Sequence, residues 1–156
     1  MLDWVILEVP EEHATVRVRS IGRHGKPIVF LHGFGGSGDD WLPVISKLGG
    51  ERRLLVIDAP GHGSCPVPAN SEQGWSIEQF GRVVCSVLEQ LDEAIVDICA
   101  FSGGAAVALS LLKLAPGRVS NSDWNFNCTI YSTQNEPMFC DSNCSIRSIS
   151  SHKHPA

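Results

Sequence analysis

One serine lies where a predicted strand turns directly into a predicted helix, and this junction restricts the fold more than any other feature of the chain. Residues 94–100 (AIVDICA) are mostly β-branched or small and apolar, which is typical of a buried strand. Residues 105–114 read as a helix, and only residues 101–104 (FSGG) separate the two. So sharp a turn needs small neighbours, which Ala100 and the two glycines provide. The pattern predicts that Ser102 is a nucleophile lifted out of a sheet, although a buried serine in an ordinary turn stays open on this motif alone.

A second predicted strand ends in a glycine-rich loop. Residues 27–31 (PIVFL) are followed by residues 32–41 (HGFGGSGDDW). Glycines let backbone amides approach a ligand closely, so we expect the amides of Phe34 and Gly103 to form an oxyanion hole beside the Ser102 hydroxyl. The loop has neither the ending of a phosphate-binding P-loop nor the spacing of a dinucleotide site, and we expect no cofactor.

Two histidines follow predicted strands. His32 comes directly after residues 27–31, and His62 lies between glycines after residues 54–58 (LLVID). The turn context favours structural roles over catalysis for both, because hydrogen bonds to nearby backbone satisfy such residues. We expect His32 to line a substrate site together with Gly33 and Phe101.

Three segments in fixed order carry a family resemblance. HGFGGSGDDW, IDAPGHGSC and AFSGGA together resemble the front half of α/β-hydrolase fold proteins of the AB hydrolase-1 type. Within that superfamily the first segment is most similar to the synthases that make 2-succinyl-6-hydroxy-2,4-cyclohexadiene-1-carboxylate for menaquinone and phylloquinone. Those synthases typically read G-Y-S-M-G-G at the serine, where this chain has Phe101 in place of tyrosine and Gly103 in place of a bulky residue.

The resemblance implies an α/β fold with a mostly parallel sheet and flanking helices, and the rest of the first 120 residues fits it. We expect residues 27–34, 54–59 and 94–100 to be adjacent parallel strands. Residues 4–9 and 14–19 alternate like an opening antiparallel pair. Two helices are expected as well, one with an apolar face and one that begins at a Ser-x-x-Gln capping box with a stripe of core residues. The apolar face of the first helix consists of Trp41, Val44, Ile45 and Leu48. The capping box of the second helix is Ser76 with Gln79, and its stripe consists of Ile77, Phe80, Val83, Val84, Val87, Leu88 and Leu91.

The composition changes abruptly after residue 120. Residues 121–156 contain no Gly, Leu or Val, although all 15 glycines lie before them. Asn and Ser fill 12 of these 36 positions, and no apolar period of a helix or strand can be found. In the family, residues 118–120 would lead into the next core strand. We expect residues 1–120 to be a partial α/β-hydrolase domain and residues 121–156 to be a disordered tail, the altered end of a truncated or alternatively spliced product.

This break limits the expected chemistry. A nucleophilic serine needs a base to take its proton and an acid to orient that base, and the resemblance implies the order serine, acid, histidine, with the histidine far downstream. Only 54 residues follow Ser102. Their aspartates and histidines are Asp123, Asp141, His152 and His154, all in the tail. We therefore expect this chain to lack a working triad.

Two functional classes stay open. One is a serine-dependent hydrolase or lyase for a small carboxylic ester or acid, either of the quinone-pathway type or a general carboxylesterase. The other is a catalytically inactive fragment that acts, if at all, by binding a partner.

Charge and cysteine content narrow the location and partners. A net charge of -5 and a pI near 5.6 argue against nucleic acid as a partner. No run is long enough to span a bilayer and the start is not basic, so we expect a cytoplasmic protein, or an organellar one if a leader lies upstream. Cys128, Cys140 and Cys144 with the tail histidines match no zinc spacing, and we expect no metal site.

Overall fold

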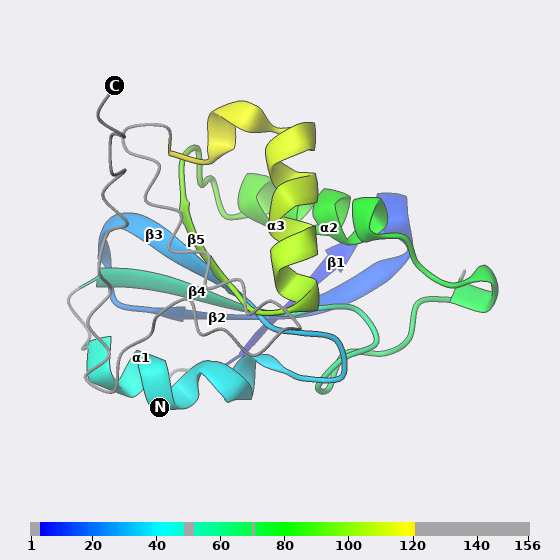
Figure 1. The fold of residues 1–156 in the computed structure, drawn as a ribbon, viewed down its shortest axis with the longest axis horizontal. Coiled ribbons are helices and arrows are strands. Elements are labelled where there is room, and N and C mark those ends of the chain that lie inside the picture. Colours follow the sequence, from blue (N-terminus) through cyan, green and yellow to red (C-terminus); the bar gives the residue numbers. More distant parts are fainter. Residues whose placement is uncertain (1–3, 49–51, 70, 121–156) are drawn as a thin grey trace, which may run out of the picture.

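Five strands form one mixed sheet in the computed structural model, which describes residues 4–48, 52–69 and 71–120 (Figure 1). The strand order across the sheet is β1-β2-β4-β3-β5. The strands are β1 (Val5–Val9), β2 (Ala14–Ile21), β3 (His24–Leu31), β4 (Arg52–Asp58) and β5 (Asp97–Ala100).

The central strand β3 is parallel to both of its neighbours, β4 and β5. This confirms that the three predicted apolar runs are parallel strands of one sheet. The strand bounds differ from the predicted ones, since β3 already ends at Leu31 and β5 begins only at Asp97. The opening pair is antiparallel as predicted, and β2 also runs antiparallel to β4. The sheet is therefore mixed, with its parallel part formed by β4, β3 and β5.

Within the described residues, three α-helices cover the two faces of this sheet (Figure 1). They are α1 (Leu42–Leu48), α2 (Ile77–Gln90) and α3 (Gly103–Leu114). Helix α1 packs on one face over Phe30 and Val56, whereas α2 and α3 pack on the other face in a larger core that includes Val29 and Leu55. Consecutive residues along β3, and likewise along β4, therefore point to opposite faces of the sheet, because side chains alternate along a strand.

Local sequence signals fix where α2 starts and how closely it approaches α3. The side chain of Ser76 accepts a hydrogen bond from the amide of Gln79, whose side chain in turn accepts one from the Ser76 amide, which confirms the predicted capping box. Most of the predicted apolar stripe is buried, namely Phe80, Val83, Val84, Val87 and Leu88, whereas Ile77 and Leu91 are half-buried. A Cβ atom at Gly81 would lie 2.4 Å from Oγ of Ser110 on α3, so a larger residue would push the two helices apart.

The chain returns to the sheet beside β5 after α3. The 3₁₀ helix Pro116–Arg118 leads to Val119, which forms a parallel bridge with Val96. The amide of Val96 donates to the carbonyl of Arg118 at 2.8 Å, and the amide of Ser120 donates to the carbonyl of Val96 at 3.2 Å. Residues 118–120 therefore start to pair beside β5, where the next strand was expected. The predicted tail, 121–156, lies outside the described residues.

No helix within residues 4–48, 52–69 and 71–120 has the length and apolar character needed to cross a bilayer.

Candidate active site

Ser102 occupies a strained turn between β5 and α3. Its backbone has φ 50° and ψ −118°, a region that non-glycine residues rarely adopt and that costs about 1–3 kcal/mol. The turn is fixed on both sides, since the amide of Phe101 donates to the carbonyl of Leu31 at 3.1 Å and the amide of Gly104 donates to the carbonyl of Phe101 at 2.9 Å. Ser102 is exposed as a result. A sharp, strained strand-to-helix turn is the local structure predicted for a nucleophile elbow, and residues 101–104 are called the elbow below; the nucleophilic role of Ser102 stays a prediction.

The two glycines after Ser102 make room for neighbouring groups. A Cβ atom at Gly104 would lie 2.4 Å from the carbonyl oxygen of Leu31 and 2.6 Å from that of His32, so only glycine lets α3 begin this close to β3. A Cβ atom at Gly103 would lie 2.4 Å from Cδ2 of Phe34, which means that the ring packs directly on the Gly103 backbone.

The glycine-rich loop lies against the elbow. A Cβ atom at Gly33 would lie 3.0 Å from the Phe101 ring and 3.2 Å from Cβ of Ser102. The structure thus brings together all the residues predicted for the site, at the carboxyl ends of the adjacent strands β3 and β5. These residues are His32, Gly33, Phe34, Phe101, Ser102 and Gly103.

The two amides assigned to the oxyanion hole are available as donors. Within the part of the chain that the structure describes, neither the amide of Phe34 nor that of Gly103 donates a hydrogen bond. Their convergence on the Ser102 hydroxyl stays a prediction.

A buried carboxylate that sequence analysis missed holds the glycine-rich loop in place. Asp58 is fully buried at the end of β4, where its Oδ2 accepts from Nε of Arg17 at 2.9 Å and pairs with Nη2 of the same guanidinium. Its Oδ1 accepts from the amide of Gly38 at 2.6 Å. The guanidinium also stacks on Trp4, with 4.4 Å from its central carbon to the ring centroid. The sequence signal that could have revealed it is a carboxylate at the end of an apolar strand, followed after one residue by Pro-Gly.

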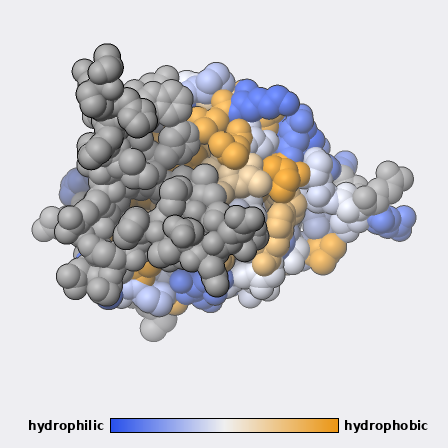
Figure 2. All heavy atoms as spheres, viewed as in Figure 1, coloured by the Kyte–Doolittle hydropathy of each residue, from blue (hydrophilic) through white to orange (hydrophobic). Residues whose placement is uncertain are grey.

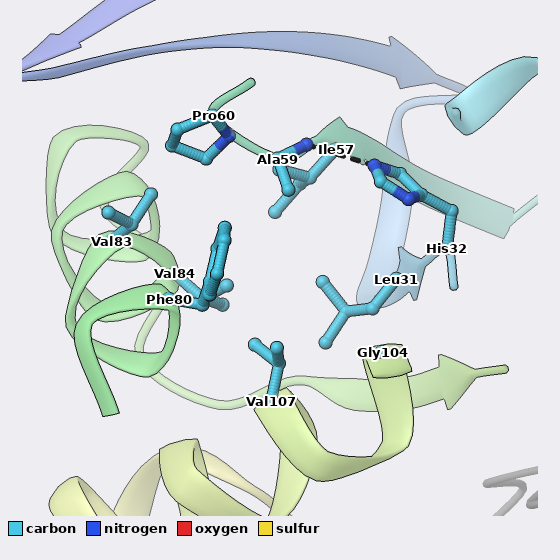
Figure 3. A pocket seen from close by; sticks show the side chains of 10 residues that line it. All are labelled: Leu31, His32, Ile57, Ala59, Pro60, Phe80, Val83, Val84, Gly104 and Val107. Atoms are coloured by element: carbon cyan, nitrogen blue, oxygen red, sulfur yellow. Dashed lines mark hydrogen bonds between the residues drawn. The ribbon is translucent and has the colours of Figure 1, made fainter. Parts of the chain in front are cut away.

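His32 ties the same loop to the turn after β4, as Figure 3 shows. Its Nε2 accepts a hydrogen bond from the amide of Ala59 at 3.0 Å, and its Nδ1 lies 2.8 Å from the carbonyl oxygen of Gly33. Because a carbonyl only accepts, the proton must be on Nδ1, and the ring is neutral. Burial lowers the pKa of His32, and the nearby His62 lowers it further. The side chain therefore acts as a structural tether, the role that its strand-end position favoured, and its contact with a substrate stays a prediction.

The Ser102 hydroxyl makes no hydrogen bond within the described residues. The other histidine near the site, His62, donates from Nδ1 to the carbonyl of Pro60 at 3.0 Å and packs against Phe34, with ring centroids 5.8 Å apart. The predicted candidates for base and acid lie outside the described residues; they are Asp123, Asp141, His152 and His154. The cysteines considered as metal ligands lie there too. Across residues 4–48, 52–69 and 71–120, no three His, Cys, Asp or Glu side chains are grouped to hold a metal ion.

Several curated proteins are similar to this chain over about two thirds of its length. The acetyltransferase component of the acetoin cleaving system of Pseudomonas putida is 37% identical over 100 residues, which make up 64% of this chain and 26% of that protein. The pimeloyl-[acyl-carrier protein] methyl ester esterase of Methylococcus capsulatus is 35% identical over 104 residues, which make up 67% of this chain and 37% of that protein. A candidate 2-succinyl-6-hydroxy-2,4-cyclohexadiene-1-carboxylate synthase of Bacillus subtilis is 31% identical over 93 residues, which make up 60% of this chain and 33% of that protein.

The fold also matches a solved structure. A hydrolase from Pseudomonas aeruginosa superposes with a TM-score of 0.68 at 23% identity, over 76% of this chain and 43% of that one. The chain spans well under half the length of each of these proteins. Residues 28–139, more than half of the chain, match the model of one family, and by that match the chain belongs to the alpha/beta hydrolase family.

Proposed function

We propose that this chain supplies the nucleophile and the oxyanion hole of a serine hydrolase that acts on a small carboxylic ester. The observation that carries the proposal is the backbone of Ser102, with φ 50° and ψ −118°, which exposes a hydroxyl at the start of α3. Strain of this kind persists only where the surrounding structure enforces it, and it is concentrated at functional sites.

The chemistry assigned to the site follows from its neighbours. The Ser102 oxygen would attack the ester carbonyl, and the amides of Phe34 and Gly103 would stabilise the oxyanion that develops. A base must take the serine proton, and a downstream histidine with its acid would supply this step. The esterase relative from Methylococcus capsulatus, with 35% identity, supports an ester as the substrate class.

A lyase of the quinone-pathway type is the second candidate. The relative from Bacillus subtilis supports it, together with the likeness of residues 32–41 to that synthase family. In this reaction Ser102 with its histidine would abstract a proton, and the oxyanion hole would hold an enolate. A lyase would exchange a substrate proton with deuterated water without forming an acyl-serine, whereas an esterase would accumulate the acyl-serine.

The experiment that tests the proposal is labelling with a fluorophosphonate probe. The purified 156-residue chain should label slowly, because loss of triad members leaves only about 10³–10⁴-fold catalysis over water. A version continued with the family's remaining strands, acid and histidine should label rapidly, and Ser102→Ala should abolish that labelling. Absence of labelling in the continued protein would favour the inactive or partner-binding alternative. Rapid labelling of the short chain at Ser102 would show that a base is already present, with His152 or His154 the first to replace.

A further inference from the structure

Trp4 lies just before β1, where its indole contacts both the neighbouring strand β2 and the glycine-rich loop. The guanidinium carbons of Arg17 and Arg19 each lie 4.4 Å from the centroid of its ring. Both arginines point to the same face of the sheet, because they are two residues apart on β2. A Cβ atom at Gly38 would lie 2.7 Å from Cη2 of Trp4, so the indole also covers the backbone at Gly38. One side chain therefore contacts two arginines and the end of the loop.

The two arginines differ in what they bind. Nε of Arg17 donates to Oδ2 of Asp58 at 2.9 Å, and Nη2 of the same guanidinium pairs with that oxygen. Among the residues that the structure describes, Arg19 pairs with no carboxylate, and its Nε is buried without a hydrogen-bond partner. Trp4 therefore stacks on one arginine that is linked to the loop through Asp58 and on one that is not.

The link continues from Asp58 into the loop. Its carboxylate is fully buried, and Oδ1 accepts a hydrogen bond from the buried amide of Gly38 at 2.6 Å. A buried carboxylate needs its counter-charge in place, and the Arg17 side chain is long and has many rotamers. Stacking on an aromatic ring restricts the plane of a guanidinium. The position of Asp58, and of the Gly38 amide bound to it, therefore depends on where Trp4 holds Arg17.

The segment between His32 and Gly38 holds the backbone amide of Phe34, which is assigned to the oxyanion hole. Its first end is held where Nε2 of His32 accepts from the Ala59 amide at 3.0 Å, and its second end is held at Gly38. Donors of this kind stabilise a developing charge only when they are already in position. Release of the second end would leave the Phe34 amide fixed from one side alone.

We propose that Trp4 is a positioning residue for this loop: its indole holds Arg17 against Asp58, and Asp58 in turn fixes the Gly38 end. The inference rests on the proposed function only for the chemistry that the loop serves. An aliphatic side chain at position 4 would also cover Gly38, but it would not hold the plane of a guanidinium. The aromatic face of Trp4 is therefore the part that positions the loop.

Hydrogen exchange of the Gly38 amide in the 156-residue chain tests the proposal without requiring catalysis. Its rate is divided by the rate of the amides in the central strand β3, so that a loss of overall stability does not enter the comparison. Trp4→Leu keeps an apolar cover but removes the aromatic face, and it should raise this ratio by about tenfold, the size of one cation–π interaction in a partly desolvated site. Trp4→Phe should raise the ratio by only about threefold, because phenylalanine is a weaker cation–π partner than tryptophan.

Arg19→Gln is the matched control, because Arg19 stacks on the same ring at the same distance as Arg17 but does not pair with Asp58. It should leave the exchange ratio of Gly38 unchanged. An unchanged ratio in folded Trp4→Leu, or an equal rise in Arg19→Gln, would overturn the proposal. Thermal unfolding of each variant shows whether it folds. If Trp4→Leu does not fold, Trp4→Phe decides, and the absence of any rise there would overturn the proposal.

Labelling of Ser102 with a fluorophosphonate probe shows whether the position of the loop matters for chemistry. Loss of one oxyanion donor costs about 10²–10³ in rate and a displaced donor costs part of that, so Trp4→Leu should slow labelling of the 156-residue chain by about tenfold. Trp4→Phe should recover most of the rate, and Arg19→Gln should label like the unmodified chain.

The positioning role and the proposed function fail in different ways. Labelling that depends on Ser102 but is equally fast in Trp4→Leu and the unmodified chain would overturn the positioning role and keep the serine hydrolase. Labelling that Ser102→Ala leaves unchanged would refute the serine hydrolase, and the exchange ratio of Gly38 would then decide by itself whether Trp4 holds the loop.

Discussion

The glycine-rich loop after β3 and the elbow after β5 lie side by side, but they are held in opposite ways. Side chains tie the loop to the sheet, since Asp58 binds the Gly38 amide and His32 links the loop to Ala59. The elbow relies on backbone hydrogen bonds and close contacts, and its serine carries positive φ with no side-chain hydrogen bond in the described residues. Side-chain contacts thus hold the loop in place and backbone contacts hold the turn at Ser102, and within the described residues no side chain is hydrogen-bonded to the Ser102 hydroxyl.

The outer face of α3 shows a related contrast. In Figure 2 apolar residues gather along the part of the molecule that α3 forms, and 57% of Leu109 and 37% of Leu114 are exposed. The opposite side of α3 is packed against α2 and the sheet, where Val107, Ala108 and Leu111 are buried. An exposed apolar face of this kind is typical of a surface that packs against another segment.

Removal of the buried carboxylate gives the largest expected effect on the tethered loop. Asp58→Ala should lower the free energy of unfolding by about 3–5 kcal/mol, because Arg17 keeps a partly buried charge without its partner and the Gly38 amide loses its acceptor. Chemical denaturation measures this. The matched control is Asp97→Ala, whose ion pairs with Lys26 and Arg52 are more exposed, with a cost of about 1 kcal/mol or less. Equal losses in both variants would mean that the Asp58 tether has no special role.

The packing of the elbow against β3 gives the next effect. Gly104→Ala should destabilise the protein by about 1–3 kcal/mol, because the new methyl group meets the backbone oxygens of Leu31 and His32, which cannot rotate away. Alanine is a better helix former than glycine, so a Gly→Ala substitution in a helix without such a close contact would stabilise the protein. Gly117→Ala tests the point, because a Cβ there meets nothing within 4 Å. A stabilised Gly104→Ala variant would show that α3 can move away from β3 at little cost.

The elbow could be predicted from sequence because its cause is local. A strand that turns into a helix within residues 101–104 allows little besides small residues around Ser102, and the structure has this conformation. The parallel strands were predictable for the same reason, as each is a short apolar run. The start of β5 was placed three residues early, because Val96 is apolar but pairs with Val119 rather than β3.

The tethers could not be predicted because their causes are distant in sequence. Arg17 and Asp58 are 41 positions apart, and only the antiparallel pairing of β2 with β4 brings them together. His62 was expected to be a turn residue, and its bond to Pro60 agrees, but its packing against Phe34 and Phe80 follows from the fold.

Relief of the serine's backbone strain gives a smaller effect, of opposite sign. Ser102→Gly should raise the free energy of unfolding by about 1 kcal/mol, because glycine adopts positive φ without a steric cost. Ser102→Ala keeps the Cβ atom and should leave stability nearly unchanged, and both variants should lose labelling in the continued protein. Denaturation curves of the two variants measured side by side separate strain from chemistry. If Ser102→Gly is no more stable than Ser102→Ala, the elbow stores no strain.

The smallest expected effect is a pH dependence carried by the His32 tether. Burial, and then the charge of His62, lower the pKa of His32, while the Gly33 carbonyl, Asp58 and Asp40 act in the opposite direction. The unfolded chain, with a histidine pKa near 6.5, therefore binds a proton more readily than the folded one, so stability is full above about pH 6.5 and falls as the pH drops below it toward the folded pKa. Denaturation at pH 7.5 and pH 5.5 should show this loss in the unmodified chain and a smaller loss in His32→Gln. The comparison is between pH slopes, because His32→Gln also removes a hydrogen bond and lowers stability at every pH. Equal slopes in the two proteins would mean that folding does not lower the pKa of His32 and that the tether carries no pH dependence.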